Sequence, residues 1–226
     1  MSDYPSWPKI PRLSKDAVIT EKIDGTNGLV SITRETFGTG VDRPDGVNVV
    51  LDYTTIDEEG IPQWEWHIRA GSRNRWLTRQ QDNAGFAAWV ERNAGALVQL
   101  GQGNHYGEWF GSGIQRNYGL AEKRFALFNA GRWYDPRDEE ANDFVREYFP
   151  KVQPCPDVCT VVPILWVGSG AEMGNAIDFL RDAMKGRMSI AVPGFEHPEG
   201  LIVYHTGASN YFKVLFDGDT PKGATK

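Results

Sequence analysis

The chain has 226 residues, enough for one large domain or two small ones with a buried core. Hydrophobic residues make up 40% and charged residues 24%, and the net charge of −6 argues against a general nucleic-acid coat, because sequence-independent binding of phosphates needs clustered Lys and Arg. No apolar run approaches membrane-spanning length and we find no leader pattern, so we expect a cytoplasmic protein.

The first part of the chain is predicted to be mostly β-strand. Segments rich in β-branched and aromatic residues predict strands, and apolar residues at helical spacing predict a helix. After an irregular lead-in, the expected elements in chain order are two strands joined by a turn over 18–34, strands over 46–54 and 63–70, and a helix over 82–100 capped by Asp82 or Asn83.

The second part mixes strands with two more helices. The expected elements are strands over 105–111 and 124–134, a short helix over 138–149 stopped by Pro150, an apolar strand over 159–168, a helix over 171–186, and strands over 199–205 and 211–216. Many strands, few helices and no regular alternation favour an α+β fold with antiparallel sheets over a doubly wound fold.

The stretch "VITEKIDGTNGLVSI" places poor strand residues inside a strand-like segment. A lysine amine acts as a nucleophile only when it is unprotonated, which burial or a neighbouring cation favours, so Lys22 at a strand end is a candidate nucleophile. Gly25 would let backbone and ligand approach closely. The same four residues also fit a hairpin in which Asp24 and Gly25 form a tight turn and Lys22 is solvated.

Residues 21–28, "EKIDGTNG", resemble the nucleotidyl-accepting motif of the covalent nucleotidyltransferases, which comprise ATP-dependent RNA ligases, DNA ligases and mRNA capping enzymes. Asn27 favours the RNA ligase 2 family, because DNA ligases usually carry arginine there. "YGEWFGSGIQ" over 106–115 supports the narrower resemblance. The remaining matching segments are "SRNRW" at 72–76, "RFALFNA" at 124–130, "EGLIVY" at 199–204 and "YFKVLF" at 211–216.

The resemblance implies a single nucleotidyltransferase domain over 1–226, with antiparallel sheets, flanking helices and a nucleotide pocket between the sheets. It implies no C-terminal OB or helical domain, and a compact stand-alone ligase suggests a phage enzyme of RNA repair. Lys22 would attack the α-phosphate of ATP and hold AMP through a phosphoramidate bond. Glu199 would support Mg²⁺ or Mn²⁺, and Lys213 would neutralise the α-phosphate.

The other implied roles concern the nucleotide. Glu108 would accept a hydrogen bond from the ribose, and Asn27 would contact the ribose or phosphate. Phe128 would stack on adenine. The alternative is that Phe125 and Phe128 are both core residues, although their spacing of three puts them on opposite strand faces, so that one could be core and the other could cover the site. The backbone around Glu21 and Ile23 would read the adenine edge, and Arg73 would bind phosphate or ribose, with Arg75 as the neighbouring alternative.

The expected partners are ATP and RNA, the RNA either as free ends or as a nicked duplex of RNA or RNA/DNA hybrid. We expect a monomer that does not interact with a membrane. The sequence departs from the family at its last motif, where the family has two lysines one residue apart and this chain has only Lys213, with Tyr211 and Leu215 at that spacing. A minimal DNA ligase, a guanylyltransferase and a non-catalytic nucleotide-binding or end-binding domain remain alternatives.

Two further groups of residues have open roles. Cys155 and Cys159 form a weak zinc pattern and are expected to be free thiols in a reducing compartment. The densest basic segment either grips nucleic acid or is a set of scattered solvated charges; it contains His67, Arg69, Arg73 and Arg75. The other histidines lack metal-ligand spacing and are expected to be structural: His105, His197 and His205.

Overall fold

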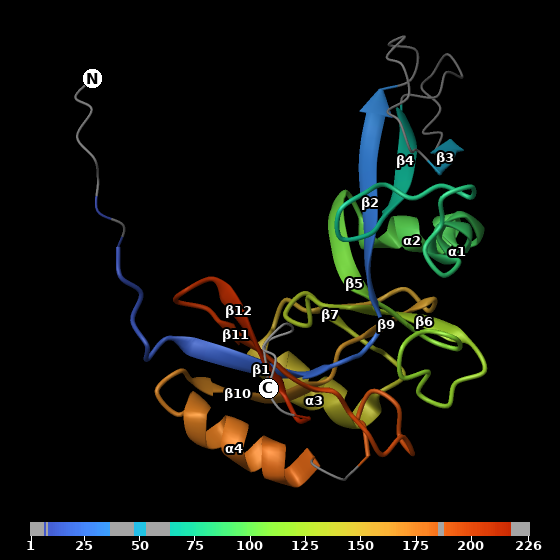
Figure 1. Cartoon of the computed structure of the whole chain (residues 1–226). Coiled ribbons are helices and arrows are strands. Elements are labelled where there is room, and N and C mark those ends of the chain that lie inside the picture. Colours follow the sequence, from blue (N-terminus) through green and yellow to red (C-terminus); the bar gives the residue numbers. More distant parts are fainter. Residues whose placement is uncertain (1–6, 8, 37–47, 53–63, 185–187, 218–226) are drawn as a thin grey trace, which may run out of the picture. The chain divides into compact units, whose positions relative to one another are not determined.

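The computed structural model describes residues 7, 9–36, 48–52, 64–184 and 188–217 (Figure 1). The chain divides into two compact units, and each has its own sheet and hydrophobic core. We call Met1–Lys22 together with Pro163–Lys226 the terminal unit, and Ile23–Val162 the central unit. In the part of the chain that is described, no helix is both long and apolar enough to cross a bilayer.

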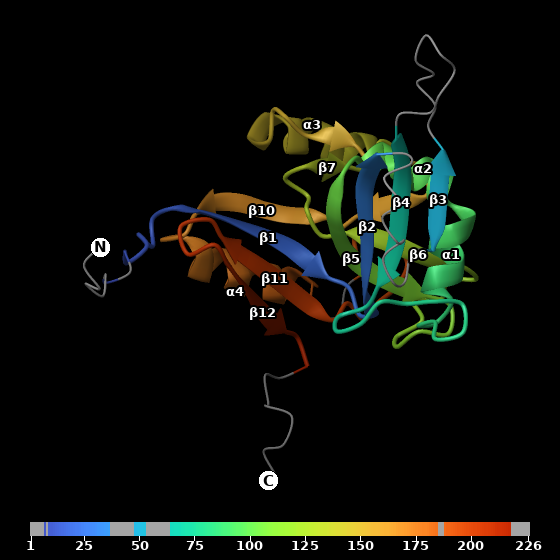
Figure 2. The ribbon, with the colours of Figure 1, turned by 90° about the horizontal axis from the view of Figure 1, so that it is seen from above.

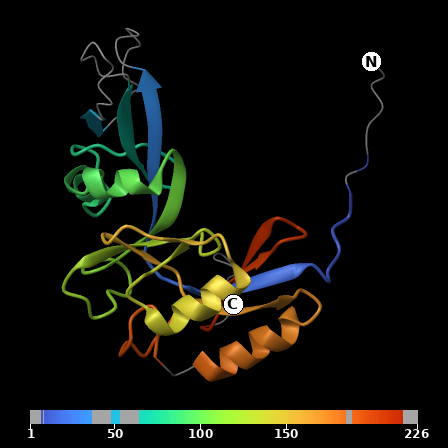
Figure 3. The ribbon, with the colours of Figure 1, turned by 180° about the vertical axis from the view of Figure 1, so that it is seen from behind.

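The terminal unit is a four-stranded antiparallel sheet with one helix (Figure 2). Its strands, in spatial order, are β10 (Ile164–Ser169), β1 (Asp16–Lys22), β11 (Gly200–His205) and β12 (Asn210–Leu215). Helix α4 (Met173–Met184) runs along one face of this sheet (Figure 3).

Helix α4 covers one face of this sheet, and the strand residues on that face are buried. Leu180 and Met184 of α4 pack against a sheet layer that contains Ile19 and Leu201. Because side chains alternate across a strand, Ile19 and Glu21 of β1 point toward the helix side and Lys22 points to the opposite face. Side-chain alternation thus gives the terminal unit one apolar face under α4 and a second face that carries Lys22.

The central unit is built on a six-stranded sheet, antiparallel except for its last pair. In spatial order the strands are β3 (Val49–Asp52), β4 (Trp64–Gly71), β2 (Thr26–Thr36), β5 (Gly103–Gly111), β6 (Lys123–Leu127) and β9 (Cys159–Val161). Strands β7 (Trp133–Tyr134) and β8 (Gln153–Pro154) form a separate short parallel sheet. The helices of this unit are α1 (Phe86–Arg92), α2 (Ala94–Leu97), the 3₁₀ helix η1 (Val98–Leu100) and α3 (Glu139–Tyr148).

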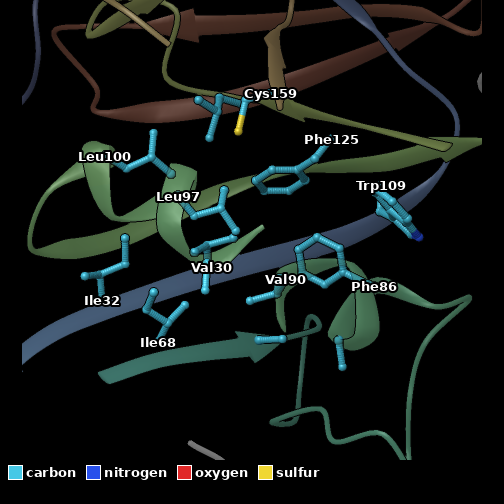
Figure 4. Packing of buried hydrophobic residues seen from close by; sticks show 14 of the residues in the cluster. Val30, Ile32, Ile68, Phe86, Val90, Leu97, Leu100, Trp109, Phe125 and Cys159 are labelled. Carbon is cyan, nitrogen blue, oxygen red and sulfur yellow. The ribbon is translucent and has the colours of Figure 1, made fainter. Parts of the chain in front are cut away.

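Aromatic rings meet in the core of the central unit, among aliphatic side chains (Figure 4). The Phe86 ring of α1 lies 5.1 Å from the Phe125 ring of β6 and 5.4 Å from the Trp109 ring of β5, measured between ring centroids. Tilted rings at such distances stabilise a core beyond the area they bury. Val30 and Ile68 extend this layer across β2 and β4.

The predicted α+β class with antiparallel sheets is confirmed, with local corrections. The expected strand over 124–134 is divided by a turn, in which the Trp133 N–H donates to the Asn129 carbonyl. The expected strand over 159–168 is divided at Pro163, which has no N–H to give to a sheet. Both corrections place a break where the sequence pattern alone looked continuous.

The predicted helix over 82–100 is also interrupted. It begins only at Phe86, after Gly85 with φ 80°, and breaks at Asn93. The Asp82 carboxylate nevertheless accepts hydrogen bonds from the Ala87 and Ala88 N–H groups, at 2.8 and 3.2 Å, so it caps the first turn from a loop.

Candidate active site

The motif that carries Lys22 crosses from one unit to the other along the chain. Glu21 and Lys22 end β1 in the terminal unit, and Ile23 begins the central unit. Strands β1 and β2 belong to different sheets, so the hairpin interpretation of Asp24-Gly25 is wrong. The predicted site residues therefore divide into two groups: Glu21, Lys22, Glu199 and Lys213 in the terminal unit, and Ile23, Asn27, Arg73, Glu108 and Phe128 in the central unit.

Lys22 and Glu199 form an ion pair although 177 residues separate them. The Lys22 Nζ donates to Glu199 Oε2, and the two side chains are only 22% and 17% exposed. Lys22 stands opposite Gly200, the residue after Glu199, in the β1–β11 ladder. Because an ion-paired ammonium is not a nucleophile, chemistry at Lys22 requires the proton to leave and Glu199 to find another positive partner.

Glycine at position 200 makes this strand arrangement possible. A Cβ at Gly200 would lie 2.1 Å from the Val214 carbonyl oxygen of β12, a distance that no side chain tolerates. The ladder continues beyond it, since the Phe216 N–H donates to the Glu199 carbonyl at 3.1 Å. The Glu-Gly pair in "EGLIVY" therefore combines a carboxylate for the site with close contact between strands.

The side chain of Glu21 has a role that the sequence did not predict. It is 1% exposed and accepts three hydrogen bonds, from Ser189 Oγ at 2.5 Å and from the N–H groups of Ile190 and Ala191 at 2.8 and 2.9 Å. Burial raises the pKa of this carboxyl, and the three hydrogen bonds partly oppose that effect. Glu21 thus ties the residue before the candidate nucleophile to the segment around Ser189.

Lys213 lies on the same sheet face as Lys22. It stands opposite Ile202 on β11, which stands opposite Thr20 on β1, and residues that face each other across a sheet project to the same side. Lys213 is exposed. The alternate residues on either side of it, Tyr211 and Leu215, share this face, so the family's second lysine has no positively charged counterpart at those two positions.

In the central unit, Asn27 and Glu108 are direct cross-strand neighbours on β2 and β5. Asn27 Nδ2 donates to Glu108 Oε2 at 3.3 Å, and Glu108 is 8% exposed. Gly25 lies close to the same strand: a Cβ there would be 2.5 Å from the Trp109 carbonyl oxygen. The close approach expected at Gly25 is therefore made to β5.

Phe125 and Phe128 have different surroundings. Phe125 is completely buried in the aromatic core. Phe128 comes directly after β6, its N–H donates to the Tyr106 carbonyl at 3.0 Å, and its side chain is 36% exposed. Of the two aromatic residues left open by the sequence, only Phe128 has a ring that a base could contact.

The loop at 72–76 distinguishes its two arginines. Both are exposed, but Arg75 Nη1 donates to the Gln81 carbonyl at 2.7 Å and so helps to hold the loop. His67 is buried and contacts Glu65 at 2.6 Å, and the Arg69 guanidinium lies 3.5 Å from the centre of the Trp76 ring. Several side chains of the basic segment therefore make contacts within the protein. Arg73 is a better candidate than Arg75 for binding a phosphate of the ligand.

Asp24, within the motif, is held by the loop that follows β5. Arg116 Nε donates to Asp24 Oδ2 at 3.2 Å, and the Asp24 N–H donates to the Tyr118 hydroxyl at 2.7 Å. This loop has φ above zero at Gln115, Asn117 and Tyr118, a backbone conformation that costs free energy for residues other than glycine. The residues that directly follow "GSGIQ" are thus linked to the motif around Lys22 through Asp24.

The two cysteines are buried free thiols in the central unit. Burial raises the pKa of Cys155 to about 12 and raises that of Cys159 as well. Since the thiolate is the reactive form, we expect neither thiol to be alkylated by iodoacetamide in the folded protein at mildly alkaline pH, and both to react after denaturation. Peptide mapping measures this, and fast labelling of native protein would contradict the buried placement.

A protein-family model described as RNA ligase matches residues 15–215. Among solved structures, a Naegleria gruberi RNA ligase variant with ATP and Mn is 20% identical with a TM-score of 0.49, and the match covers 90% of this chain and 50% of that chain. The same enzyme with PPi is 20% identical with a TM-score of 0.46 and coverages of 89% and 50%.

This chain therefore spans about half the length of the solved chains that it matches. No curated protein matches it. The family-model match, in contrast, begins just before β1 and ends with β12, and it includes Lys22, Glu108, Phe128, Glu199 and Lys213. On the strength of that match, the chain belongs to the RNA ligase family.

Proposed function

We propose that the protein is an ATP-dependent RNA ligase of the RNA ligase 2 type. The observation that carries this proposal is the contact between Lys22 and Glu199, because it joins the lysine of "EKIDGTNG" to the carboxylate of "EGLIVY" within one unit. A nucleophile and an acidic group that lie far apart in sequence and meet in partial burial are a typical arrangement for a reactive lysine.

In the first step Lys22 Nζ gives a proton to solvent water and the free amine attacks the α-phosphorus of ATP. An N–P bond forms, the bond from the α-phosphorus to the bridging oxygen breaks, and pyrophosphate leaves with the electron pair. Transfer of a phosphoryl group depends mostly on positioning and on neutralising charge at phosphate oxygens. Lys213, exposed on the face that carries Lys22, is the residue we assign to that neutralisation.

The other proposed roles concern recognition of the nucleoside. Glu108 is held by Asn27 and can accept hydrogen bonds from ribose hydroxyls. Phe128 offers a ring for adenine, and Arg73 offers a guanidinium for phosphate or ribose. The backbone of Glu21 and Ile23 would read the adenine edge.

The residues present fit Mg²⁺ or Mn²⁺ bound mainly through substrate. No cluster of three or more His, Cys, Asp or Glu side chains that could hold a metal occurs among the residues described. Mg²⁺ commonly binds through one or two carboxylates together with substrate phosphates and water, so Glu199 can supply the protein ligand. An ion held by Glu199 would neutralise charge on the phosphates, and Glu199 would then no longer need Lys22 as its positive partner.

The later steps would use RNA. An oxygen of an RNA 5′-phosphate attacks the lysine-bound AMP, so the P–N bond breaks and Lys22 is released; a 3′-hydroxyl then attacks the activated 5′-phosphorus and AMP leaves. Alignment of the hydroxyl supplies much of the acceleration of that last step. We propose a monomer that acts on RNA ends or nicked duplex in RNA repair, in the cytoplasm of a phage host.

The direct test is intact-mass measurement after incubation with ATP and Mg²⁺, followed by mapping of the modified peptide. The expected result is one added AMP on the peptide that contains Lys22, and sealing of nicked RNA in preference to nicked DNA. Sealing of DNA alone would indicate a DNA ligase, an adduct only with GTP would indicate a guanylyltransferase, and no adduct at all would indicate a binding domain.

Replacing Phe128 by alanine tests the assignment of the adenine platform. Base stacking on an aromatic ring contributes roughly 1–3 kcal/mol, so the KM for ATP in adduct formation should rise about tenfold or more. Phe128→Tyr keeps a ring and should retain most of the affinity. The rate of adduct formation at several ATP concentrations measures the effect, and an unchanged KM in Phe128→Ala would remove Phe128 from the nucleotide site.

A further inference from the structure

Two tyrosines form a stacked pair on the sheet face of the terminal unit that carries Lys22. Tyr204 of β11 stands opposite Tyr211 of β12, and their ring centroids are 4.6 Å apart with planes inclined by 34°. Tyr204 also stands opposite Val18 of β1. Because Val18 and Lys22 are four residues apart on one strand, both project to the same face, about 13 Å apart.

The outer ring of this pair is available to a ligand. Tyr211 is 62% exposed, while Tyr204 is half-buried beside it. A cross-strand aromatic pair does stabilise a sheet, but that role is served by the contact between the rings and does not need the outer ring to stay open. α4 and the apolar core lie on the opposite face, so this pair is separate from the core packing.

Two charged side chains of opposite sign lie at opposite ends of the tyrosine pair on this face. Lys213 follows Tyr211 by two residues on β12 and lies at the end of the tyrosine pair that is nearer Lys22. Asp16 precedes Val18 by two residues on β1 and lies at the other end. Both side chains are exposed. Lys213 therefore attracts a phosphate on the side of the tyrosines that is nearer Lys22, and Asp16 repels one on the other side. An aromatic platform next to a lysine is a combination that binds single-stranded nucleic acid, with bases on the ring and phosphate on the cation.

We infer that Tyr211, supported by Tyr204, is a stacking platform for one base of a single-stranded RNA end, with Lys213 on the adjoining phosphate. This inference rests on the proposed function, since it names where that ligase would hold its RNA. It predicts a contact that depends on the presence of a base and tolerates its identity, because every base has a face that can stack.

The test is direct binding of a fluorescently labelled single-stranded oligoribonucleotide, followed by anisotropy at one fixed low salt concentration. We expect Tyr211→Ala to weaken binding about tenfold and Tyr211→Phe to bind like the native protein, because stacking survives loss of the hydroxyl. Phe179→Ala is the matched control: it removes an equally exposed aromatic ring from α4, 72% exposed, and should leave binding unchanged.

An oligoribonucleotide without bases along its length separates stacking from charge. Native protein and Tyr211→Ala should bind it equally, since only phosphates remain. Equal binding of the intact RNA by native protein and Tyr211→Ala would overturn the inference, as would the same loss on the abasic RNA. Should Tyr211→Ala lower the unfolding midpoint, Tyr211→Ile gives the same comparison with a residue that favours strands.

Adduct formation with ATP alone distinguishes the failure of this inference from the failure of the proposed function. Tyr211→Ala should form the Lys22–AMP adduct at the native rate, because Tyr211 lies two strands away from β1 and opposite Val18, which is itself about 13 Å along the strand from Lys22. If not even the native protein forms an adduct, the proposed function fails, and RNA anisotropy still decides whether Tyr211 is a platform. Loss of the adduct in Tyr211→Ala alone would place this residue in the nucleotide site and overturn the inference.

Discussion

Lys22→Arg is expected to abolish the AMP adduct completely while leaving the protein folded. Arginine can keep the ion pair with Glu199, but a guanidinium stays protonated at any working pH and cannot attack phosphorus. The substitution therefore removes the nucleophile and retains the charge. The measurement is intact mass after incubation with ATP and Mg²⁺, together with the unfolding midpoint of each variant.

The control for this prediction is Lys15→Arg, which changes an exposed lysine in the same unit. It should form the adduct like the native protein. Sealing of chemically 5′-adenylylated RNA without ATP gives a second comparison, because that step needs no attack by Lys22. An adduct that persists in Lys22→Arg on another residue would refute the assignment of the nucleophile.

Glu21→Ala should destabilise the protein strongly. It leaves the Ser189 hydroxyl and the N–H groups of Ile190 and Ala191 without their acceptor and creates a cavity, and we expect a loss of roughly 2–3 kcal/mol in the free energy of unfolding. Glu21→Gln keeps one acceptor oxygen and the volume, so its loss should be about 1 kcal/mol.

Chemical denaturation measures these losses, with Glu196→Ala, an exposed glutamate in the neighbouring loop, as the control. We also expect adduct formation to slow in Glu21→Gln at saturating ATP, since Glu21 fixes the residue that precedes the nucleophile. A purely structural role would lower the unfolding midpoint and leave that rate unchanged in the protein that remains folded.

The pH dependence of stability distinguishes native protein from Glu21→Gln. Because burial raises the pKa of Glu21 in the folded state, the folded protein binds more protons at this site than the unfolded chain at pH values above the ordinary carboxyl pKa of 4.5. Stability contributed by this group therefore falls as pH rises through that window. The free energy of unfolding of native protein minus that of Glu21→Gln should be largest in acid and decline toward neutral pH.

Local sequence patterns were sufficient for much of the fold. Strand-forming residues located β1, β2, β4, β5, β11 and β12, and alternation along β1 already separates a buried side from the side of Lys22. The helix over 82–100 was predicted with too few breaks, because its apolar spacing continues through Asn93 while the backbone does not. Such interruptions depend on how the segment packs, which short-range patterns do not contain.

From the sequence alone, Lys22 could be predicted at a strand end in a ligase-like motif, with Glu199, Phe128 and Lys213 in segments of the same family pattern. Which of these groups touch depends on the three-dimensional fold. Strand pairing in the terminal unit brings Glu199 to Lys22 across 177 residues and Ser189 to Glu21 across 168 residues. Contacts between such distant residues follow from the register of strands and the burial of side chains, and neither can be predicted from the residues nearby in sequence.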